Sequence, residues 1–363
     1  MKVTFITTEN HNIGDDFVRL GLENLLTEVN PEIDFQTIHK HKPLSVRGDF
    51  YKHIPLSISN FLDSLLPFNT QDKILSADKV IISGAPLYWC HPKKNSHSFQ
   101  NEWFIPLIKK RLNEKKQIYL LTLAIGSCQN YGDDSSHACN DCSMFLNDLY
   151  KHSTLLTVRD KYLQEVYALQ SKKVSCIPCP SLFAKDTFGL KKERSDYIVM
   201  NCMEYGGHYD FLNIIDKENW QKKFIQLYQY FKTQQQVIIS CHSQNEVSLI
   251  KNILPNADIF YKENDPKAYL YLYKNASFGI VNRIHAAYAL ASFGVQSIVI
   301  GNDSRVQMLD LLDIKHVFVN EADVDTITKT YHTLIETQSE FEVSILKLIQ
   351  QTRKDYLNLL KEV

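Results

Sequence analysis

The sequence predicts an α/β protein built from two doubly wound, Rossmann-like domains that face each other across a cleft. Short apolar segments alternate with segments of helical periodicity along the whole chain, which is typical of parallel sheets wrapped by helices. The polar stretch Lys185–Ser195 interrupts this alternation, and 363 residues suffice for two domains. We therefore expect an N-terminal domain over residues 1–190, a C-terminal domain over 191–340 and a C-terminal helix over 341–363.

In the first domain, apolar runs of strand length and stretches of helical period follow one another. We expect strands at Lys2–Thr8, Ile33–Ile38, Lys79–Ser83, Gln117–Leu123, Leu155–Val158 and Lys173–Ile177. We expect helices at Asp15–Val29, Phe99–Glu114, Cys142–Lys151 and Arg159–Leu169. The segment His39–Pro67 contains scattered proline, histidine and serine and is predicted to be irregular.

In the second domain the alternation resumes after the polar stretch. We expect strands at Asp196–Asn201, Gln236–Cys241, Asp258–Tyr261, Phe278–Val281 and Ser297–Ile300. We expect helices at Glu218–Lys232, Asn245–Leu254, Pro266–Lys274, His285–Ser292, Arg305–Leu312 and Glu340–Leu360. Pro266 suits the first turn of its helix, and Gly294 suits a helix C-terminus.

Composition and charge narrow the class of protein. Hydrophobic residues make up 44% of the chain and charged residues 22%, which is normal for a globular protein. The formal net charge is −1, whereas proteins that bind nucleic acid through its phosphates usually carry a strong basic excess, so nucleic acid is not an expected partner. The N-terminus lacks a signal-peptide pattern and no run reaches the ~18 apolar residues of a transmembrane helix, so we expect a cytoplasmic protein.

Ligands of doubly wound sheets bind in the loops that leave the carboxyl ends of the strands, so these loops are the first places to look for a site. After the first strand come Asn12, Gly14, Asp15 and Asp16, which open a helix. Two carboxylates would repel a phosphate, so this loop is interpreted as a binder of neutral hydroxyls. The alternative is that Asn12 and Asp15 only cap the helix.

Two aromatic residues, Tyr88 and Trp89, follow the small-residue turn after the third strand. Aromatic rings at the mouth of a cleft can stack on sugar rings, but such residues more often serve as packing groups. Both interpretations remain open at this point.

In the second domain, Arg283 and His285 stand where a buried strand joins a helix. The free N–H groups and partial positive charge of a helix N-terminus favour an anion. A guanidinium suited to phosphate or carboxylate strengthens that preference, and an imidazole can exchange a proton near neutral pH. Ser243 starts a neighbouring helix, and Ser304 and Arg305 start the next helix along the chain. The sequence therefore predicts an anion site around Arg283 and His285, with a surface arginine and a core histidine as the alternative.

Three short motifs, in order across most of the chain, resemble the polysaccharide pyruvyl transferase family. They are Asn12-x-Gly14-Asp15, Thr157-Val158-Arg159-Asp160 and Arg283-Ile284-His285, the last followed by a helix of small residues and Gly294. Where that family usually has a run of glycines after the third strand, this sequence has Gly84-Ala85-Pro86. This departure leaves the shape of the cleft, and therefore the acceptor, undetermined.

The resemblance implies a glycosyltransferase-B-like fold and the transfer of a pyruvyl group from phosphoenolpyruvate to sugar hydroxyls, with no cofactor required. Arg283 and His285 would hold the donor in the second domain, and His285 would act as general acid or assist the leaving phosphate. Asp15 or Asp16, on the acceptor side, would orient or deprotonate the acceptor. Arg159 is a further candidate for anion contact, whereas Asp160 is interpreted as structural.

Cysteines form a second candidate site. Cys128, Cys139 and Cys142 precede a Cys176-x-x-Cys179 pair, and His137 lies nearby in the sequence. Such residues can build a zinc or iron–sulfur site, although buried thiols at strand ends would account for Cys176 and Cys179 without a metal.

Two alternatives to pyruvyl transfer share the same architecture. A nucleotide-sugar glycosyltransferase would also place a cation near a diphosphate, and a non-catalytic protein could bind a phosphorylated metabolite in the cleft. Peripheral contact with a membrane, through a lipid-linked substrate, is compatible with any of these. The sequence does not determine the oligomeric state.

Overall fold

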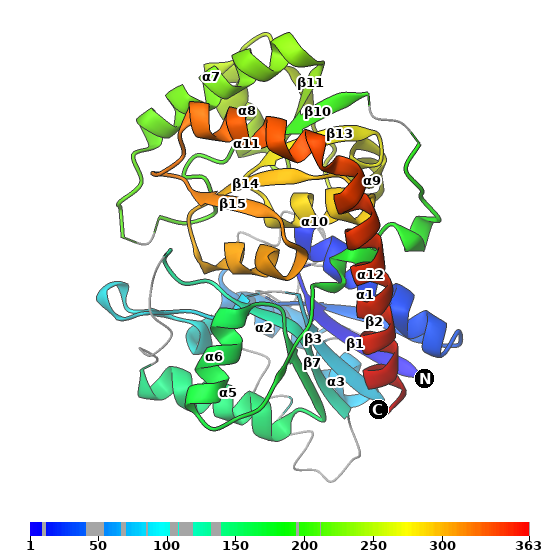
Figure 1. Ribbon diagram of the computed structural model, residues 1–363. Helices are drawn as coiled ribbons and strands as arrows, with labels where there is room; N and C mark the ends of the chain where they lie inside the picture. The colour runs from blue at the N-terminus through cyan, green and yellow to red at the C-terminus, as the bar shows by residue number, and fades with distance from the viewer. Residues whose placement is uncertain are drawn as a thin grey trace.

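Two parallel β-sheets, each with helices packed on it, lie one above the other in the computed structural model (Figure 1). The structure describes residues 1–8, 12–40, 54–66, 70–84, 86–101, 108, 119–131, 139–193, 196–210 and 212–362. These two parallel sheets with their helices confirm the predicted α/β fold class.

The first sheet has the strand order β2-β1-β3-β7-β8-β9, and β4 pairs with β7. Its strands are β1 (Lys2–Thr7), β2 (Asp34–His39), β3 (Lys79–Ser83), β4 (Pro86–Tyr88), β7 (Tyr119–Ser127), β8 (Leu155–Val158) and β9 (Ser175–Cys176). β5 (Cys90–His91) and β6 (Ser96–His97) form a separate antiparallel hairpin. The strand order reverses between β1 and β3, so a crevice is expected at the carboxyl ends of these two strands.

The helices of the first half fill the crossovers between these strands. They are α1 (Ile13–Val29), α2 (Leu56–Ser64), α3 (Thr70–Leu75), α5 (Asn140–His152) and α6 (Lys161–Leu169). Short 3₁₀ helices are η3 (Pro92–Lys94), η4 (Ser98–Asn101), η6 (Pro180–Phe183) and η7 (Asp186–Phe188). Asn12 caps α1 by accepting a hydrogen bond from the Gly14 N–H, and Asp160 caps α6 by accepting one from Leu163 N–H.

The second sheet has the order β12-β11-β10-β13-β14-β15, and all of its neighbouring strands are parallel. Its strands are β10 (Tyr197–Met200), β11 (Val237–Ser240), β12 (Asp258–Phe260), β13 (Ala276–Val281), β14 (Ser297–Gly301) and β15 (Lys315–Phe318). The accompanying helices are α7 (Lys217–Gln234), α8 (Gln244–Ile253), α9 (Pro266–Tyr273), α10 (Ile284–Ser292), the 3₁₀ helix η8 (Ser304–Leu312), α11 (Val324–Glu336) and α12 (Gln338–Lys361). The order reverses between β10 and β13, which places the second crevice after these strands.

The two halves share one apolar core. Residues of α1, α9 and α10 belong to the same buried cluster, and the Phe17 ring meets the Tyr273 ring edge-on with centroids 6.4 Å apart. Helix α12 leaves the second half and runs back along the first, ending close to the N-terminus (Figure 1). There Tyr356 donates a hydrogen bond to the Pro178 carbonyl, and Arg353 pairs with Glu28 and Asp186. The C-terminal helix therefore packs against α1, α10 and η7.

Most of the predicted elements are present, with several differences. A helix, α2, occupies part of the predicted irregular segment, beginning directly after Pro55. The predicted helix at Arg305–Leu312 is a 3₁₀ helix, and β15 and α11 fall where no element was predicted. The predicted helix Phe99–Glu114 lies mostly outside the described residues. β9 and β10 flank the expected boundary at residue 190, but the domain division itself stays a prediction.

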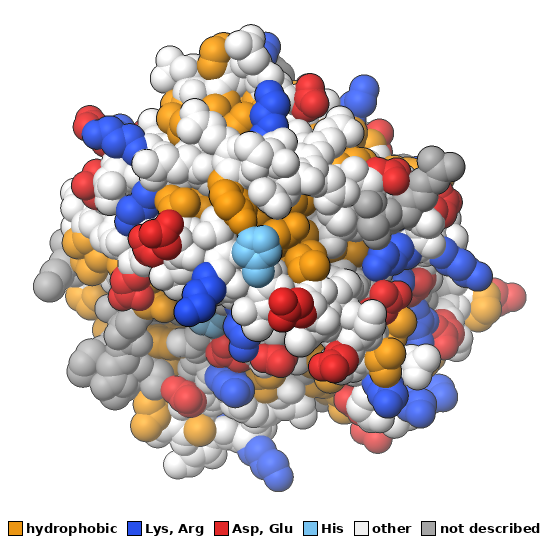
Figure 2. Space-filling model, turned by 45° about the horizontal axis from the view of Figure 1, so that its top comes forward, with side chains coloured by type: hydrophobic (Ala, Val, Ile, Leu, Met, Phe, Trp, Pro, Cys, Tyr) orange, Lys and Arg blue, Asp and Glu red, His pale blue; other side chains and the backbone are white. Residues whose placement is uncertain are grey.

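The surface carries both signs of charge. Figure 2 shows acidic and basic side chains interspersed over the described part of the face in view, in keeping with the net charge of −1. Within the described ranges, no helix combines the length and the apolar character needed to cross a bilayer.

Candidate functional site

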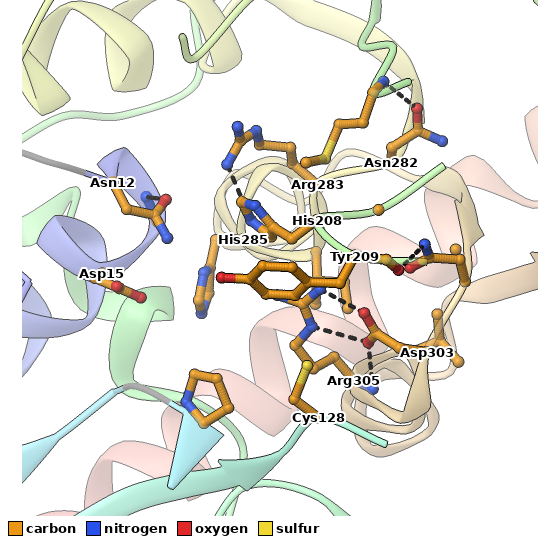
Figure 3. A pocket seen from close by; sticks show the side chains of 18 of the residues that line it. Asn12, Asp15, Cys128, His208, Tyr209, Asn282, Arg283, His285, Asp303 and Arg305 are labelled. Carbon is orange, nitrogen blue, oxygen red and sulfur yellow. Dashed lines mark hydrogen bonds and ion pairs between the residues drawn. The ribbon is translucent and has the colours of Figure 1, made fainter. Parts of the chain in front are cut away.

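A cavity of about 530 Å³ lies where the crevices of the two sheets meet. Its walls come from the loops after β1, β10, β13 and β14 and from the segment around β4. Figure 3 shows Asn12 and Asp15 on one side and Arg283, His208 and Arg305 on the other. The cavity is of a size that encloses a small metabolite and part of a second substrate.

The cavity wall formed by the first half of the chain contains a buried carboxyl group. Asp15, in the first turn of α1, lines the cavity and accepts a hydrogen bond from the Thr8 hydroxyl. Burial raises the pKa of Asp15 above its usual value, although the Thr8 hydrogen bond and the positive charge of Arg159 act in the opposite direction. A carboxyl group with a raised pKa is a better proton acceptor than an ordinary aspartate once it is ionised.

Gly14 allows the two walls to approach each other. A Cβ atom placed on Gly14 would lie 2.9 Å from Cγ of His285 and still closer to Nδ1 of the same ring. His285 stands at the second position of α10, so this contact fixes the ring between two helix N-termini. The motif glycine is therefore explained by close packing against His285, because any side chain would displace the ring.

We expect Gly14→Ala to displace His285 and to lower turnover by roughly 10²-fold, because a misplacement of about 1 Å has an effect of this size. Overpacking at this contact should also destabilise the fold by about 1–3 kcal/mol. Gly189→Ala is the matched control, since it strains a left-handed residue (φ 61°) at which the added Cβ would meet nothing within 4 Å. Steady-state kinetics and thermal unfolding of both variants separate the two effects. Equal losses of turnover in both would contradict the role of this contact.

Arg283, at the centre of the predicted anion site, lines the cavity but already has an anionic partner within the protein. Arg283 is the N-cap residue of α10, and its guanidinium forms an ion pair with Glu246, with a second hydrogen bond from Nε at 3.0 Å. The side chains of Arg283 and Glu246 are 9% and 6% exposed. The protein thus supplies its own anion to this arginine, which explains how a cation is tolerated at a helix N-terminus.

Arg305 also has a carboxylate partner within the protein. Its Nε and Nη2 atoms donate to the two carboxylate oxygens of Asp303 at 2.8 Å and 2.5 Å. Asp303 is the N-cap residue of η8 and accepts a further hydrogen bond from the Arg305 N–H. Both the guanidinium of Arg305 and the carboxylate of Asp303 line the cavity.

Arg159 differs from these two arginines. It is 1% exposed, lines the cavity, and has no carboxylate within ion-pair distance among the described residues. One amino group donates to the Gly84 carbonyl and lies 3.3 Å from Nε2 of His285, while its buried Nε has no hydrogen-bond partner in the described structure. The carboxyl groups of Asp15 and Asp160 interact with it electrostatically but form no direct ion pair, so an anion that enters the cavity and meets the guanidinium gains a strong partner.

The protonation state of the His285 ring follows from these neighbouring charges and from its burial. Burial, followed by the positive charges of Arg159, Arg305 and Arg283, lowers the pKa of the His285 ring well below 6.5. The ring is therefore neutral near pH 7 in the free protein. Because the Arg159 guanidinium can only donate, Nε2 of the neutral ring accepts and Nδ1 carries the proton.

The structure brings most of the predicted site residues to one cavity. The predicted residues that line it are Asn12, Gly14, Asp15, Trp89, Arg159, Ser243, Arg283, His285 and Arg305. Asp16, Tyr88 and Ser304 are not part of its wall. Asp16 pairs with Arg19, Tyr88 packs against the Tyr162 ring, and the Ser304 hydroxyl lies 2.8 Å from that of Ser127 in the other half.

Several cavity residues were missed by the sequence analysis. They are Thr8, Lys40, Ser96, His208, Tyr209, His242, Asn282 and Asp303, together with Glu246 behind Arg283. Glu246 could have been found, because Ser243-x-x-Glu246 has the spacing of a capping box and the Ser243 hydroxyl accepts from the Glu246 N–H. His208 and Tyr209 lie in the loop after β10, but nothing in their spacing indicates that they reach Arg283 and the cavity (Figure 3).

The cysteines are arranged differently from the prediction. Cys139 and Cys142 lie in one group with Cys90 and His97, with ligand atoms all within 4.8 Å of one another. Cys128, Cys176 and Cys179 are not in that group: Cys128 lines the cavity, Cys176 lies in β9, and Sγ of Cys179 is 3.8 Å from Nε2 of His285. His137 lies outside the described residues. The possible ligand set is therefore Cys90, His97, Cys139 and Cys142.

Comparison with known proteins gives one family and one type of fold. The sequence model of the polysaccharide pyruvyl transferase family matches residues 12–304. No curated protein matches the sequence. Among solved structures, the UDP-GlcNAc 2-epimerase from Neisseria meningitidis bound to UDP-GlcNAc superposes with a TM-score of 0.54 at 13% identity, covering 100% of both chains.

Two further structures show the same fold. MnaA from S. aureus with UDP superposes with a TM-score of 0.56 at 11% identity, covering 94% of this chain and 90% of the other. The Methanocaldococcus jannaschii UDP-GlcNAc 2-epimerase in complex with UDP-GlcNAc and UDP gives 0.51 at 14% identity, covering 92% and 93%. At such low identities these likenesses concern the fold alone.

Proposed function

We propose, from the premise that this chain belongs to the polysaccharide pyruvyl transferase family, that it moves a pyruvyl group from phosphoenolpyruvate to two hydroxyls of a glycan or lipid-linked sugar. The product would be a cyclic ketal. The observation that carries the proposal is Arg159, a buried guanidinium without a carboxylate partner, beside His285 and on the cavity wall that also presents Asp15.

The charges of the cavity fit an anionic donor. Phosphoenolpyruvate carries a phosphate and a carboxylate, and the N-termini of α1, α8 and α10 lie at the cavity wall. Because Arg283 and Arg305 already have carboxylate partners, Arg159 is proposed as the principal contact of the donor, with Arg283 and Arg305 adding to the field. This moves the centre of the donor site from Arg283, where the sequence placed it, toward Arg159.

The reaction needs an acid and a base on opposite sides of the donor. A proton is added to the methylene carbon of phosphoenolpyruvate, an acceptor hydroxyl attacks the adjacent carbon, and phosphate leaves as the second hydroxyl closes the ring. The acceptor gains the atoms of phosphoenolpyruvate less those of phosphoric acid, so the reaction is balanced without an oxidant, a reductant or water. We assign the acid to His285 and the orientation and deprotonation of the acceptor hydroxyl to Asp15.

Donor binding prepares His285 for this task. In the free protein the ring is neutral, because burial and the surrounding arginines lower its pKa. The negative charges of a bound donor offset those guanidiniums and raise the pKa of His285, so the ring gains its proton only when the donor is present. An empty site would therefore not hold a charged acid.

The test is phosphate release from phosphoenolpyruvate that depends on a sugar diol, with a product whose mass has gained one pyruvate less one water. We expect Asp15→Asn to lower kcat by roughly 10²–10⁴-fold, the size of a lost acid–base group. Asp16→Asn is the matched control, because the neighbouring carboxylate does not line the cavity, and it should stay close to wild type. Acceptor-independent phosphate release, or equal losses in the two variants, would contradict the assignment.

A nucleotide-sugar-dependent glycosyltransferase is the second candidate. Tyr209 is 56% exposed and its ring extends into the cavity, where it offers an aromatic face to a nucleobase (Figure 3). Acceptor modification that depends on a nucleotide sugar, and not on phosphoenolpyruvate, would favour this candidate. A purely binding role is disfavoured, because the chain belongs to a family of transferases.

A further inference from the structure

Two structural elements far apart in the sequence bring four ligand-type side chains together. Cys90 and His97 are directly paired residues of the antiparallel β5–β6 hairpin. Cys139 is the N-cap residue of α5, and Cys142 lies in the first turn of that helix. Cys90, His97 and Cys142 are buried, at 5%, 9% and 0% exposure.

We propose that these four residues bind one structural zinc ion. Nδ1 of His97 lies 3.5 Å from Sγ of Cys142 and 3.7 Å from Sγ of Cys139. Around a tetrahedral zinc with ordinary Zn–S and Zn–N lengths, sulfur and nitrogen ligands are about 3.6 Å apart. These two distances already match the spacing around the ion, and all four ligand atoms lie within 4.8 Å of one another.

The chemistry of the four ligand side chains favours zinc over other metals. Three thiols and one imidazole are a borderline-soft set of the Cys₃His type that is typical of structural zinc, whereas calcium and magnesium take oxygen ligands. Iron–sulfur clusters are normally held by four thiolates. With four protein ligands no position is left open for water or substrate, so the role is structural.

The surroundings of the group also suit thiolate ligands. Cys139 and Cys142 lie at the N-terminus of α5, and a helix N-terminus favours negative charge. The hairpin side is held in place as well, because the Gln129 side chain donates to the Cys90 carbonyl and the His97 ring stacks on Phe99 at 5.5 Å.

The zinc site would fix one wall of the cavity. Trp89 and Ser96 each immediately precede a proposed ligand, both line the cavity, and Nε1 of Trp89 lies 3.3 Å from the Ser96 hydroxyl. Lys40 lies over the Trp89 ring at 5.6 Å. An ion that joins the hairpin to α5 therefore holds Trp89 in position. On the proposed function this wall meets the acceptor, but the zinc assignment does not depend on that function.

The first test is the metal content of protein purified without chelators from zinc-supplemented cells. We expect about one zinc per chain in the wild type, less than a tenth of that in Cys142→Ser, and unchanged zinc in the control Cys176→Ser, whose thiol lies outside the group. Wild-type protein with zinc near zero would overturn the proposal, as would equal losses of zinc in the two variants. Iron and sulfide in place of zinc would also overturn it.

Wild-type protein alone provides a second test, which does not depend on the folding of a variant. Cobalt exchanged into the site should give the visible absorption of a tetrahedral, thiolate-bound ion, and zinc should protect Cys139, the most exposed thiol of the group, from alkylation. An octahedral cobalt spectrum, or an alkylation rate of Cys139 that zinc does not change, would contradict the proposed ligands. Neither result depends on phosphoenolpyruvate, so failure here is distinguishable from failure of the proposed function.

Discussion

Arg159→Met should abolish the rise in melting temperature that phosphoenolpyruvate causes and should lower kcat/KM by at least about 10²–10³-fold, the cost of losing one preorganised charge contact. The reason is that Arg159 is the cavity arginine without a carboxylate partner among the described residues, so its charge is available to a ligand. Differential scanning fluorimetry and phosphate-release kinetics measure the two effects.

The same variant should not lower the stability of the free protein. The substitution gives up one hydrogen bond to the Gly84 carbonyl, worth about 1 kcal/mol, and the attraction to Asp15 and Asp160, but it also removes a buried charge whose desolvation costs several kcal/mol. Arg353→Met is the matched control, because Arg353 pairs with Glu28 and Asp186 and does not line the cavity. That variant should keep its full response to phosphoenolpyruvate. If it loses the response too, Arg159 has no special role.

His285→Gln should lower kcat by roughly 10²–10⁴-fold and change the affinity for phosphoenolpyruvate by less than about tenfold, because the glutamine keeps a polar contact but cannot carry the proton. Single-turnover kinetics and calorimetry separate the two parameters. A variant that lost affinity and kept kcat would show that His285 only binds the donor.

The pH dependence of donor binding follows from the same residue. In the free protein the pKa of His285 lies well below 6.5, so the ring is neutral at pH 7, and a bound anion raises that pKa. At a pH between the two values, binding takes up a proton, so the affinity for phosphoenolpyruvate falls as the pH rises through the raised value. Calorimetry in buffers of different ionisation enthalpy should detect this uptake in the wild type and not in His285→Gln. Equal uptake in both would contradict the assignment.

Periodicity and strand-end positions predicted the fold and many of the cavity residues. The alternation of elements located both sheets, and the carboxyl ends of β1 and β13 carry Asp15 and His285 as expected. Local spacing could not predict which residues pair across the fold. The Arg283–Glu246 ion pair joins α10 to α8 and spans 37 positions, so the sequence presented Arg283 as an uncompensated cation when it is not.

The cysteines illustrate the same limit. The short Cys139-x-x-Cys142 spacing was visible in the sequence, but the other two members, Cys90 and His97, lie on a two-residue-strand hairpin more than forty positions earlier. Strands this short leave no periodic signal. Cys176-x-x-Cys179 has the same spacing as Cys139-x-x-Cys142, yet the fold directs Cys179 toward Arg159 and His285. Spacing alone cannot distinguish these outcomes.

The measurement that tests the account most directly is thermal unfolding of the wild type and Arg159→Met with phosphoenolpyruvate and, separately, with a panel of nucleotide sugars. A ligand that binds only the folded state raises the melting temperature. We expect a rise with phosphoenolpyruvate in the wild type that is absent in Arg159→Met. A rise with a nucleotide sugar alone, or a response to phosphoenolpyruvate that Arg159→Met retains in full, would contradict it.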